Sequence, residues 1–266
     1  MRRKDLEKRR EEEEGEERVN RGVIMKSSLN ETYELEELSF YFLELELQSI
    51  MWFSSLAQPH INVFVQTQIP VIHNYPLLLA MKGYIAEESY VSRYNELKNT
   101  TPPSRLFSNM GLYVYPLMLE KIYYTRFLLS MAETDYVFYK IKTRLAVPIM
   151  TAYNALAPGT RGLTVAITQR DTPISGEERV LRLGAKRFGV WRVLRADRAN
   201  VRLINGPVKA TTPFNVEDVK YLVSSAIVVL KHYAGDVAIS GVFEKALELQ
   251  DGDRELIKPI PFFISI

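Results

Sequence analysis

The sequence contains no cysteine, only three histidines and no long apolar run. Without cysteine the chain can form no disulfide, no thiolate metal site and no cysteine nucleophile. His60, His73 and His232 are scattered and offer little from which to build a zinc site, so we expect no metal or other cofactor. No stretch approaches the roughly 20 apolar residues that span a bilayer, and the charged N-terminus does not resemble a signal peptide. We therefore expect a cytoplasmic protein that does not contact a membrane.

Charge is distributed unevenly along the chain, although the formal net charge of its 266 residues is only +2. Residues 27–60 contain six glutamates and no lysine or arginine, whereas residues 121–210 contain sixteen Lys/Arg and six Asp/Glu. A strongly basic block inside a nearly neutral protein is typical of a surface that binds a polyanion.

The first half of the chain predicts a charged tail followed by mixed structure. Residues 1–26 carry almost no apolar side chains, so we expect a flexible tail, followed by a single domain over residues 27–266. Leu38–Leu47 alternates in the period-two pattern of a half-exposed strand. Asn74 is placed to cap a helix that ends near Gly83. A polar stretch, residues 92–110, predicts a surface loop, and Pro116 should either confine a strand at Gly111–Leu119 to a sheet edge or interrupt it.

The second half predicts mainly strands. Short apolar or alternating runs follow one another with turn residues between them at 174–178, 186–189 and 196–200. An ambiguous apolar stretch, 218–231, precedes two further strands, and the turn between those strands at 251–253 is a hairpin signal. The sequence therefore predicts one α+β domain with more strand than helix. The expected strands lie at 136–142, 163–169, 179–184, 189–195, 201–204, 237–249 and 256–264.

The basic block is densest in residues 179–209, which contain nine Lys/Arg against one acid, Asp197. Arginine binds phosphate through two parallel hydrogen bonds, and an aromatic side chain such as Trp191 can stack on an unpaired base. The segment therefore predicts an RNA-binding surface, although a solvated face or a contact with an acidic protein partner would have the same composition. The candidate contacts are Lys140, Lys142, Arg144, Arg161, Arg182, Lys186, Arg187, Trp191, Arg192, Arg195, Arg198 and Arg202.

The second candidate site is His73-Asn74-Tyr75. These side chains could hold an RNA backbone, or act as acid and base in attack by a ribose 2′-hydroxyl. Such residues more often complete a hydrogen-bond network in the core, and Asn74 already serves as the expected helix cap. The glycine-containing loops at 158–162 and 184–189 lack the spacing of nucleotide-binding loops, and the scattered carboxylates offer no pair for acid–base or two-metal chemistry.

Four segments together resemble a known family. They resemble, in order, the type I-D CRISPR-associated RAMP subunits of the Cas-five type, known as Csc-one, from about residue 35 to the C-terminus. The segments are His73-Asn74-Tyr75-Pro76 with the apolar helix Leu77–Met81, Gly111–Pro116, Arg182–Lys186, and Asp236–Phe263 with Ser240-Gly241 and Pro259–Pro261.

The resemblance implies a RAMP fold, which is a modified RRM-like or ferredoxin-like core with extended β-hairpin insertions. It implies a non-catalytic subunit that caps the 5′ handle of the CRISPR RNA in the type I-D effector (Cascade) complex. The implied partners are the large effector subunit and the backbone filament subunit, and contact with target DNA near the protospacer-adjacent motif stays open. Two alternatives stay open as well: a metal-independent endoribonuclease that uses His73 and Tyr75, and an RNA-independent scaffold that binds an acidic partner.

Overall fold

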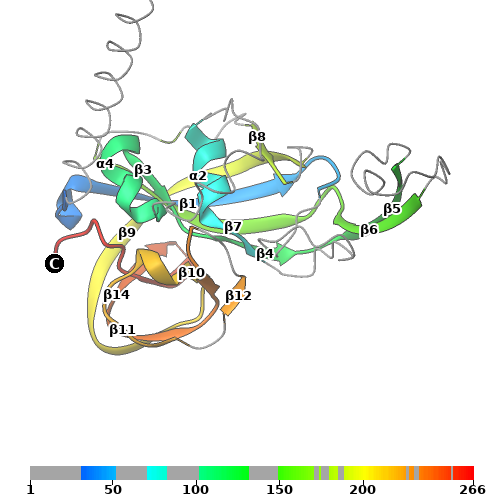
Figure 1. Ribbon diagram of the computed structural model, residues 1–266. Coiled ribbons are helices and arrows are strands. Elements are labelled where there is room, and N and C mark those ends of the chain that lie inside the picture. The colour runs from blue at the N-terminus through cyan, green and yellow to red at the C-terminus, as the bar shows by residue number, and fades with distance from the viewer. Residues whose placement is uncertain are drawn as a thin grey trace, which may run out of the picture.

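The protein is described by a computed structural model for residues 31–51, 71–82, 102–131, 149–170, 174, 180–184, 189–225, 228–230, 234–252 and 254–266. Within these residues the main sheet has ten antiparallel strands. Seven of them follow the order β11-β14-β9-β1-β7-β4-β2, and β3, β8 and β15 pair with β7, β9 and β14 (Figure 1).

The centre of the sheet is β1, which spans Leu38–Leu47, the predicted bounds. The prediction that this strand is half-exposed is wrong, because both of its edges are paired and both of its faces are packed, and none of its residues is exposed. Strands β7 (Arg161–Gln169) and β9 (Gly189–Ala210) pair with its two edges. The outer edge of β7 pairs with β3 (Leu112–Val114) and β4 (Leu117–Lys121), which are separated at Pro116 as expected.

This arrangement is the strand order of a ferredoxin-like core. Both β1 and the β3–β4 pair run antiparallel to β7 and therefore parallel to each other, with β7 inserted between them. Helix α2 (Asn74–Lys82) lies between them in the chain, which makes a split βαβ unit. The predicted α+β fold with more strand than helix is confirmed.

The two faces of the sheet carry separate apolar clusters. Leu43 and Leu45 of β1 point to one face, where they cluster with Leu77 and Leu78 of α2; we call this the helix-side face. Phe42 points to the opposite face. There the apolar side chains cluster with the C-terminal segment and with α4 (Phe107–Met110), and the rings of Phe107 and Phe263 stack with centroids 4.0 Å apart.

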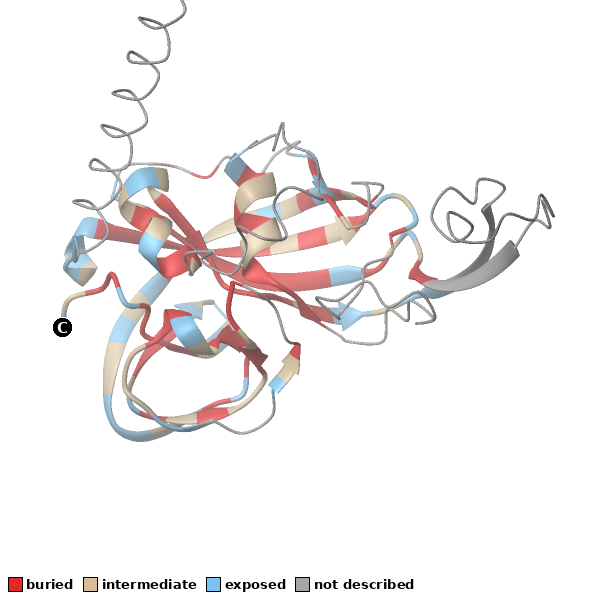
Figure 2. Ribbon diagram, in the orientation of Figure 1, coloured by how far each residue is buried: buried red, intermediate tan, exposed pale blue. Residues whose placement is uncertain are grey.

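Strand β9 continues far beyond the central sheet. It pairs with β1 up to Ala199, and from Asn200 onward it pairs with β14 (Gly241–Asp251). The sequence predicted two strands with a turn at 196–200, which is wrong. Pairing with β1 overrides the turn preference of these residues. The extension curls into a lobe, along which β9 is mostly exposed or half-buried (Figures 1 and 2).

The remaining elements complete the lobe and an arm. In the lobe, β11 (Leu222–Ser225) and β15 (Arg254–Pro259) pair with successive parts of β14. A small second sheet completes this end of the molecule. At the other end of the molecule, β5 (Tyr124–Met131) and β6 (Ile149–Leu156) form a projecting two-stranded arm (Figure 1). The other described elements are η1 (Leu35–Glu37), β2 (Val71–Ile72), η3 (Pro103–Leu106), β8 (Val180–Leu183), β10 (Phe214–Asn215), η5 (Val216–Asp218), β12 (Val228–Leu230) and β13 (Val237–Ala238).

Several other local predictions can be compared with the structure. The hairpin at 251–253 is confirmed, since Asp251 pairs with Arg254 across a turn in which Gly252 has a φ of 56°. The loop expected at 92–110 is wrong for its described part, where η3 and α4 form. The ambiguous stretch 218–231 contains the strands β11 and β12. The predicted tail at 1–26 and the strand at 136–142 lie outside the described residues.

A buried lysine, Lys258, lies on β15 of the main sheet, next to the ring of Tyr115. Lys258 is 2% exposed, and its Nζ lies 5.0 Å from the centre of the Tyr115 ring. Burial lowers the pKa of Lys258 from 10.5 to about 7. Between these two values the unfolded chain holds a proton that the folded chain does not, so the free-energy cost of burying this amine falls, and the stability of the fold rises, as pH increases through that window.

Replacing the buried amine should therefore stabilise the protein at neutral pH. We expect Lys258→Met to raise the Tm at pH 7 by about 2–4 °C, the shift that roughly 1 kcal/mol produces in a chain of this size. The variant should also lose part of the rise in Tm that the unmodified protein shows between about pH 7 and pH 10. Thermal unfolding followed by circular dichroism measures both effects.

The matched control is Lys209→Met, because Lys209 is exposed on β9. An unchanged pH dependence in Lys258→Met, equal to that of the control, would show that Lys258 is not desolvated in solution.

Candidate nucleic-acid interface

The sheet face opposite α2 changes from apolar to charged along β1. After Phe40 and Phe42, the next side chains on this face are Glu44 and Glu46. Residues directly opposite each other in antiparallel strands point to the same face. Arg161 of β7 and Arg192 of β9 lie opposite Glu46, one on each side. Lys121 of β4 lies opposite Arg161 in turn, so a charged row crosses four strands.

Further basic residues extend this row. Arg195 lies opposite Glu44 on β9, and Asp197 lies opposite Phe42. Arg182 of β8 lies opposite Val190, two residues before Arg192, and therefore points to the same face. Arg254 reaches the row from the hairpin tip, where its Nη2 lies 3.2 Å from Glu44. We call this surface the polar face; its members are Glu44, Glu46, Lys121, Arg161, Arg182, Arg192, Arg195, Asp197 and Arg254.

Ion pairs neutralise part of the polar face. Arg161 Nε lies 2.7 Å from Glu46, and Arg195 Nη2 lies 2.8 Å from Asp197. A hydrogen bond from Gln48 and the nearby Arg161 lower the pKa of Glu46, so its carboxylate is ionised at neutral pH. Six basic side chains against three carboxylates still leave a surplus of three positive charges. The face therefore attracts anions, though less strongly than the composition of residues 179–209 predicted.

Two of the arginines on this face are exposed and available. Arg182 and Arg192 are both exposed, and neither forms an ion pair with a residue that the structure describes. The guanidinium groups of Arg182 and Arg192 can therefore donate hydrogen bonds to an incoming phosphate.

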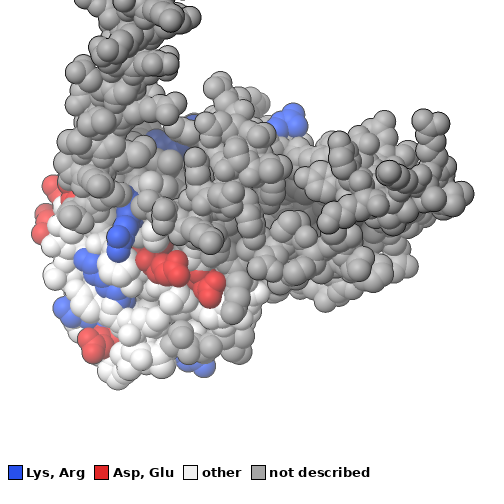
Figure 3. Space-filling view, viewed as in Figure 1, with Lys and Arg blue, Asp and Glu red and all other residues white. Residues whose placement is uncertain are grey.

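The structure does not bring all the predicted contacts to one surface. Arg198 lies opposite Tyr41 and points to the helix-side face, where its Nη2 is 3.4 Å from the Ser39 hydroxyl. Arg202 lies four residues after Arg198 on β9, so it points to the same side as Arg198 and away from the polar face, and it forms an ion pair with Glu248 of β14. On the side of the molecule drawn in Figure 3, basic and acidic residues are interspersed over the lobe. We therefore remove Arg198 and Arg202 from the candidate interface.

The assignment of Trp191 as a stacking platform also needs correction. Its side chain is completely buried on the helix-side face, and its Nε1–H donates to the sulfur of Met51 at 2.9 Å. A ring without exposed surface cannot stack on a base. The predicted contacts Lys140, Lys142, Arg144, Lys186 and Arg187 lie outside the described residues.

His73 is a structural residue in this fold. It is 3% exposed, its Nδ1 accepts from the backbone N–H of Tyr75 at 2.9 Å, and its Nε2 lies 2.9 Å from the carbonyl oxygen of Gly235. These partners indicate that Nε2 carries the proton and that His73, in place of the predicted Asn74, caps helix α2. Burial lowers the pKa of His73 to about 4, so the ring is neutral at pH 7.

Asn74 belongs to a buried network around Asp218. The Asp218 carboxylate accepts from Asn74 Nδ2 at 2.6 Å, from the Ser104 N–H at 2.9 Å and from the Tyr113 hydroxyl at 3.3 Å. Burial raises the pKa of Asp218 to about 6. The network joins α2, η3, β3 and η5, and none of its central atoms is exposed. We therefore remove His73 and Asn74 from the candidate RNA contacts; Tyr75 is only half-buried.

Comparison with known proteins identifies the family. The model of a family described as type I-D CRISPR-associated protein Cas5/Csc1 matches residues 38–233. The chain belongs to this family. The resemblance inferred from the sequence is thereby confirmed, and the chain is a CRISPR-associated effector subunit.

More distant comparisons add little to the Cas5/Csc1 assignment. No curated protein matches the chain. Among solved structures, a chain of the cryo-EM structure of the type III-B Cmr-beta bound to cognate target RNA has a TM-score of 0.41 and 11% identity. It aligns with 69% of this chain and 67% of its own length. The crystal structure of a CRISPR protein from Archaeoglobus fulgidus has a TM-score of 0.35 and 13% identity, over 83% and 99% of the two chains. Neither likeness is close enough to inform function.

Three residues at the polar face of the Cas5/Csc1 chain were not predicted from the sequence: Lys121 and Arg254 within it, and Tyr123 beside it. Lys121 and Arg254 lie far from residues 179–209 in the chain, and only the sheet brings them to the face. Tyr123 is 43% exposed and follows Lys121 closely, with the lysine Nζ 5.3 Å from its ring centre. The sequence Lys-Ile-Tyr-Tyr at 121–124, which places a tyrosine two residues after a lysine, was the available signal.

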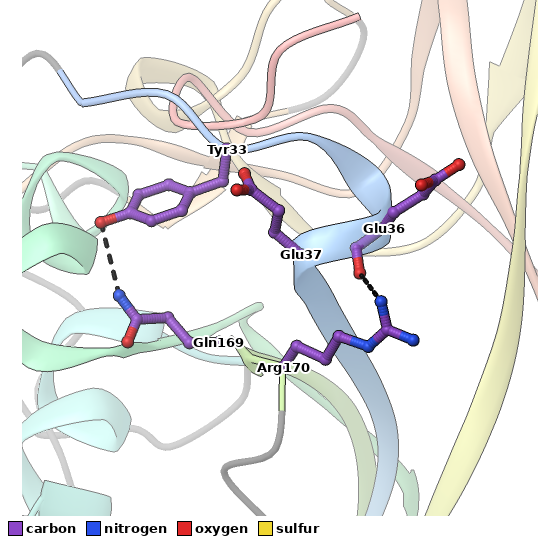
Figure 4. A pocket seen from close by; sticks show the side chains of 5 residues that line it. All are labelled: Tyr33, Glu36, Glu37, Gln169 and Arg170. Atoms are coloured by element: carbon purple, nitrogen blue, oxygen red, sulfur yellow. Dashed lines mark hydrogen bonds between the residues drawn. The ribbon is translucent and has the colours of Figure 1, made fainter.

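The described residues contain no strong candidate for a metal or small-molecule site. No cluster of three or more histidines and acidic residues is arranged to hold a metal within this part of the protein. A shallow pocket of about 390 Å³ is lined by Tyr33, Glu36, Glu37, Gln169 and Arg170 (Figure 4). The Nη1 of Arg170 in this pocket donates a hydrogen bond to the Glu36 carbonyl oxygen at 3.3 Å. None of the described helices is long and apolar enough to cross a membrane.

The Asp218 network makes a prediction about stability. Asp218→Ala should lower the free energy of unfolding by about 2–4 kcal/mol, because Asn74, Ser104 and Tyr113 lose a shared buried acceptor. Chemical denaturation measures this change. The control is Glu217→Ala, which removes the same charge from the exposed neighbouring residue. Equal stability of the two variants would contradict a structural role for the network.

Proposed function

We propose that this Cas5/Csc1 family chain binds CRISPR RNA through its polar face, as a non-catalytic subunit of a type I-D effector complex. In this role it holds the 5′ handle of the guide and contacts the large subunit and the backbone filament subunit. The observation that carries the proposal is the pair of exposed arginines, Arg182 and Arg192, on a sheet face with a surplus of positive charge.

The chemistry of the polar face suits a nucleic acid better than an acidic protein. Guanidinium groups and carboxylates alternate across the row, as at Arg161, Glu46 and Arg192. Arginine forks bind phosphates, and carboxylates accept hydrogen bonds from the exocyclic amino groups of bases. A partner surface made mainly of carboxylates would supply no such donors to Glu44 and Glu46.

The buried position of His73 argues against the endoribonuclease alternative. A general base must come within about 2.6–3.2 Å of the proton it removes, directly or through one water. Both ring nitrogens of His73 already have backbone partners, and only 3% of the residue is exposed. The polar face supports binding and offers no candidate acid–base pair among its described residues.

Removing the two exposed arginines, Arg182 and Arg192, should weaken RNA binding. We expect the double variant Arg182→Ala/Arg192→Ala to bind a single-stranded guide RNA roughly tenfold or more weakly, because two phosphate contacts are lost. The slope of log K against log salt should become shallower by about 1.4, at about 0.7 per contact. Fluorescence anisotropy with a labelled guide RNA at several salt concentrations measures both quantities.

The matched control is Lys82→Ala/Lys209→Ala, which removes the same charge from exposed positions on α2 and on the lobe. The control should retain nearly all of the affinity. Equal losses in both double variants would mean that net charge, and not the polar face, determines binding. If the unmodified protein binds no RNA at moderate salt but binds an acidic effector subunit, the scaffold alternative replaces this proposal.

A second prediction concerns catalysis. Incubated with CRISPR RNA precursor in EDTA, the purified protein should leave the RNA intact, and His73→Ala should change only stability. Gel electrophoresis of end-labelled precursor provides the readout. Cleavage by the unmodified protein that disappears in folded His73→Ala would establish the enzyme alternative.

A further inference from the structure

Tyr123 lies at the border of the polar face, where β4 ends and the projecting arm begins. Its neighbour Lys121 lies opposite Arg161 on the polar face, and the lysine Nζ is 5.3 Å from the Tyr123 ring centre. The ring is therefore on the same side of the sheet as the charged row. With 43% of its surface exposed, Tyr123 offers aromatic area directly beside the ammonium group of Lys121.

The backbone that carries this ring is fixed in place. The N–H of Tyr123 donates to the Thr160 hydroxyl at 3.1 Å, and that hydroxyl donates to the Ala157 carbonyl at 2.8 Å. The N–H of Ala157 donates back to the Tyr123 carbonyl at 2.8 Å. An exposed side chain on a backbone fixed by three hydrogen bonds is preorganised for binding, since little further order is lost when a ligand arrives.

The Tyr123 side chain is not part of a buried hydrogen-bond network. One edge of its ring faces Gly159, whose φ is 86°, and a Cβ at that position would lie at an ordinary packing distance of 3.5 Å from the ring. The Tyr123 hydroxyl donates no hydrogen bond to any residue within the described structure. The exposed ring therefore has no hydrogen-bonded role in the core.

An unpaired nucleic-acid strand presents the complementary chemistry. Each nucleotide has a flat base that can stack on an aromatic ring and a phosphate that a nearby cation can bind. The row from Lys121 to Arg192 crosses four strands, or three spacings of about 4.8 Å, which is about 14 Å in total. This length fits a few consecutive phosphates, and Tyr123 lies at the end of it.

We propose that Tyr123 is a base-stacking subsite for an unpaired nucleotide of the RNA. A base lies on the Tyr123 ring while Lys121 and Arg161 bind the adjoining phosphates, with Lys121 moving from the ring to a phosphate. The subsite rests on the proposed function, because it extends the same RNA-binding face. The subsite marks the point at which the RNA strand passes from the main sheet to the base of the β5–β6 arm.

Tyr124 provides a matched control one residue away. It is 52% exposed, and it lies opposite Leu156, whose side chain belongs to the helix-side cluster. Consecutive side chains in an extended chain point in opposite directions, so Tyr124 points away from the polar face. The two tyrosines have similar exposure, and only Tyr123 adjoins the charged row.

The experiment compares Tyr123→Ala, Tyr123→Phe and Tyr124→Ala in the full chain. The probes are single-stranded guide RNAs with 2-aminopurine, whose fluorescence falls on stacking, at successive handle positions. Tyr123→Ala should bind about 5- to 100-fold more weakly and lose the quenching at one position, as expected for one stacked base. The salt dependence should not change, because no charge is removed. Tyr123→Phe and Tyr124→Ala should behave like the unmodified protein.

The outcomes separate this subsite from the proposed function. If Tyr123→Ala binds normally while Arg182→Ala/Arg192→Ala is weakened, the stacking subsite is wrong and RNA binding by the polar face stands. If neither variant is weakened, both proposals fail. Normal RNA binding by Tyr123→Ala with reduced assembly into the effector complex would assign the ring to a protein contact and overturn the subsite. Circular dichroism confirms that each variant is folded.

Discussion

The structure depends on the pairing of β1 with β7 on one edge and β9 on the other. This double pairing sets which side chains of all three strands share a face. Because β1 carries Phe40 and Phe42 at one end and Glu44 and Glu46 at the other, a single strand provides both the apolar core of that face and its charged extension. A register shift of one residue would turn these glutamates into the helix-side apolar cluster and bring Leu43 and Leu45 to the polar face.

The same pairing sets the electrostatics of the candidate interface. The arginines of β7 and β9 come from the basic half of the sequence, and the glutamates that they meet come from the acidic segment near its start. Opposite charges therefore lie side by side, and they orient Arg161 and Arg195 while leaving Arg182 and Arg192 exposed. The resulting surface has modest positive charge and many directed hydrogen-bond groups. Such a surface favours recognition of a particular strand over indiscriminate attraction of anions.

Much of the fold was predictable where local chemistry alone decides the outcome. The strand at Leu38–Leu47, the break at Pro116 and the turn at Gly252 each depend on neighbouring residues, and each appeared as predicted. The prediction failed where a distant partner decides. Residues 196–200 contain turn-forming types, yet they are extended because β1 pairs with them. From the sequence, His73 could not be distinguished from a catalytic residue. The carbonyl of Gly235 that pairs with its Nε2 lies 162 residues away in the chain, and no local pattern reveals it.

Composition, periodicity and the order of short motifs were enough by themselves to determine the family, the α+β class and the presence of a basic segment. Only the tertiary structure decided which basic residues act together. It placed Lys121 and Arg254 on the same face as Arg192, turned Arg198 to the other face, buried Trp191 and paired Arg202 with Glu248. The reason is physical: the direction of a side chain follows from strand register and from bulges, and both are set by hydrogen bonds between segments far apart in the chain.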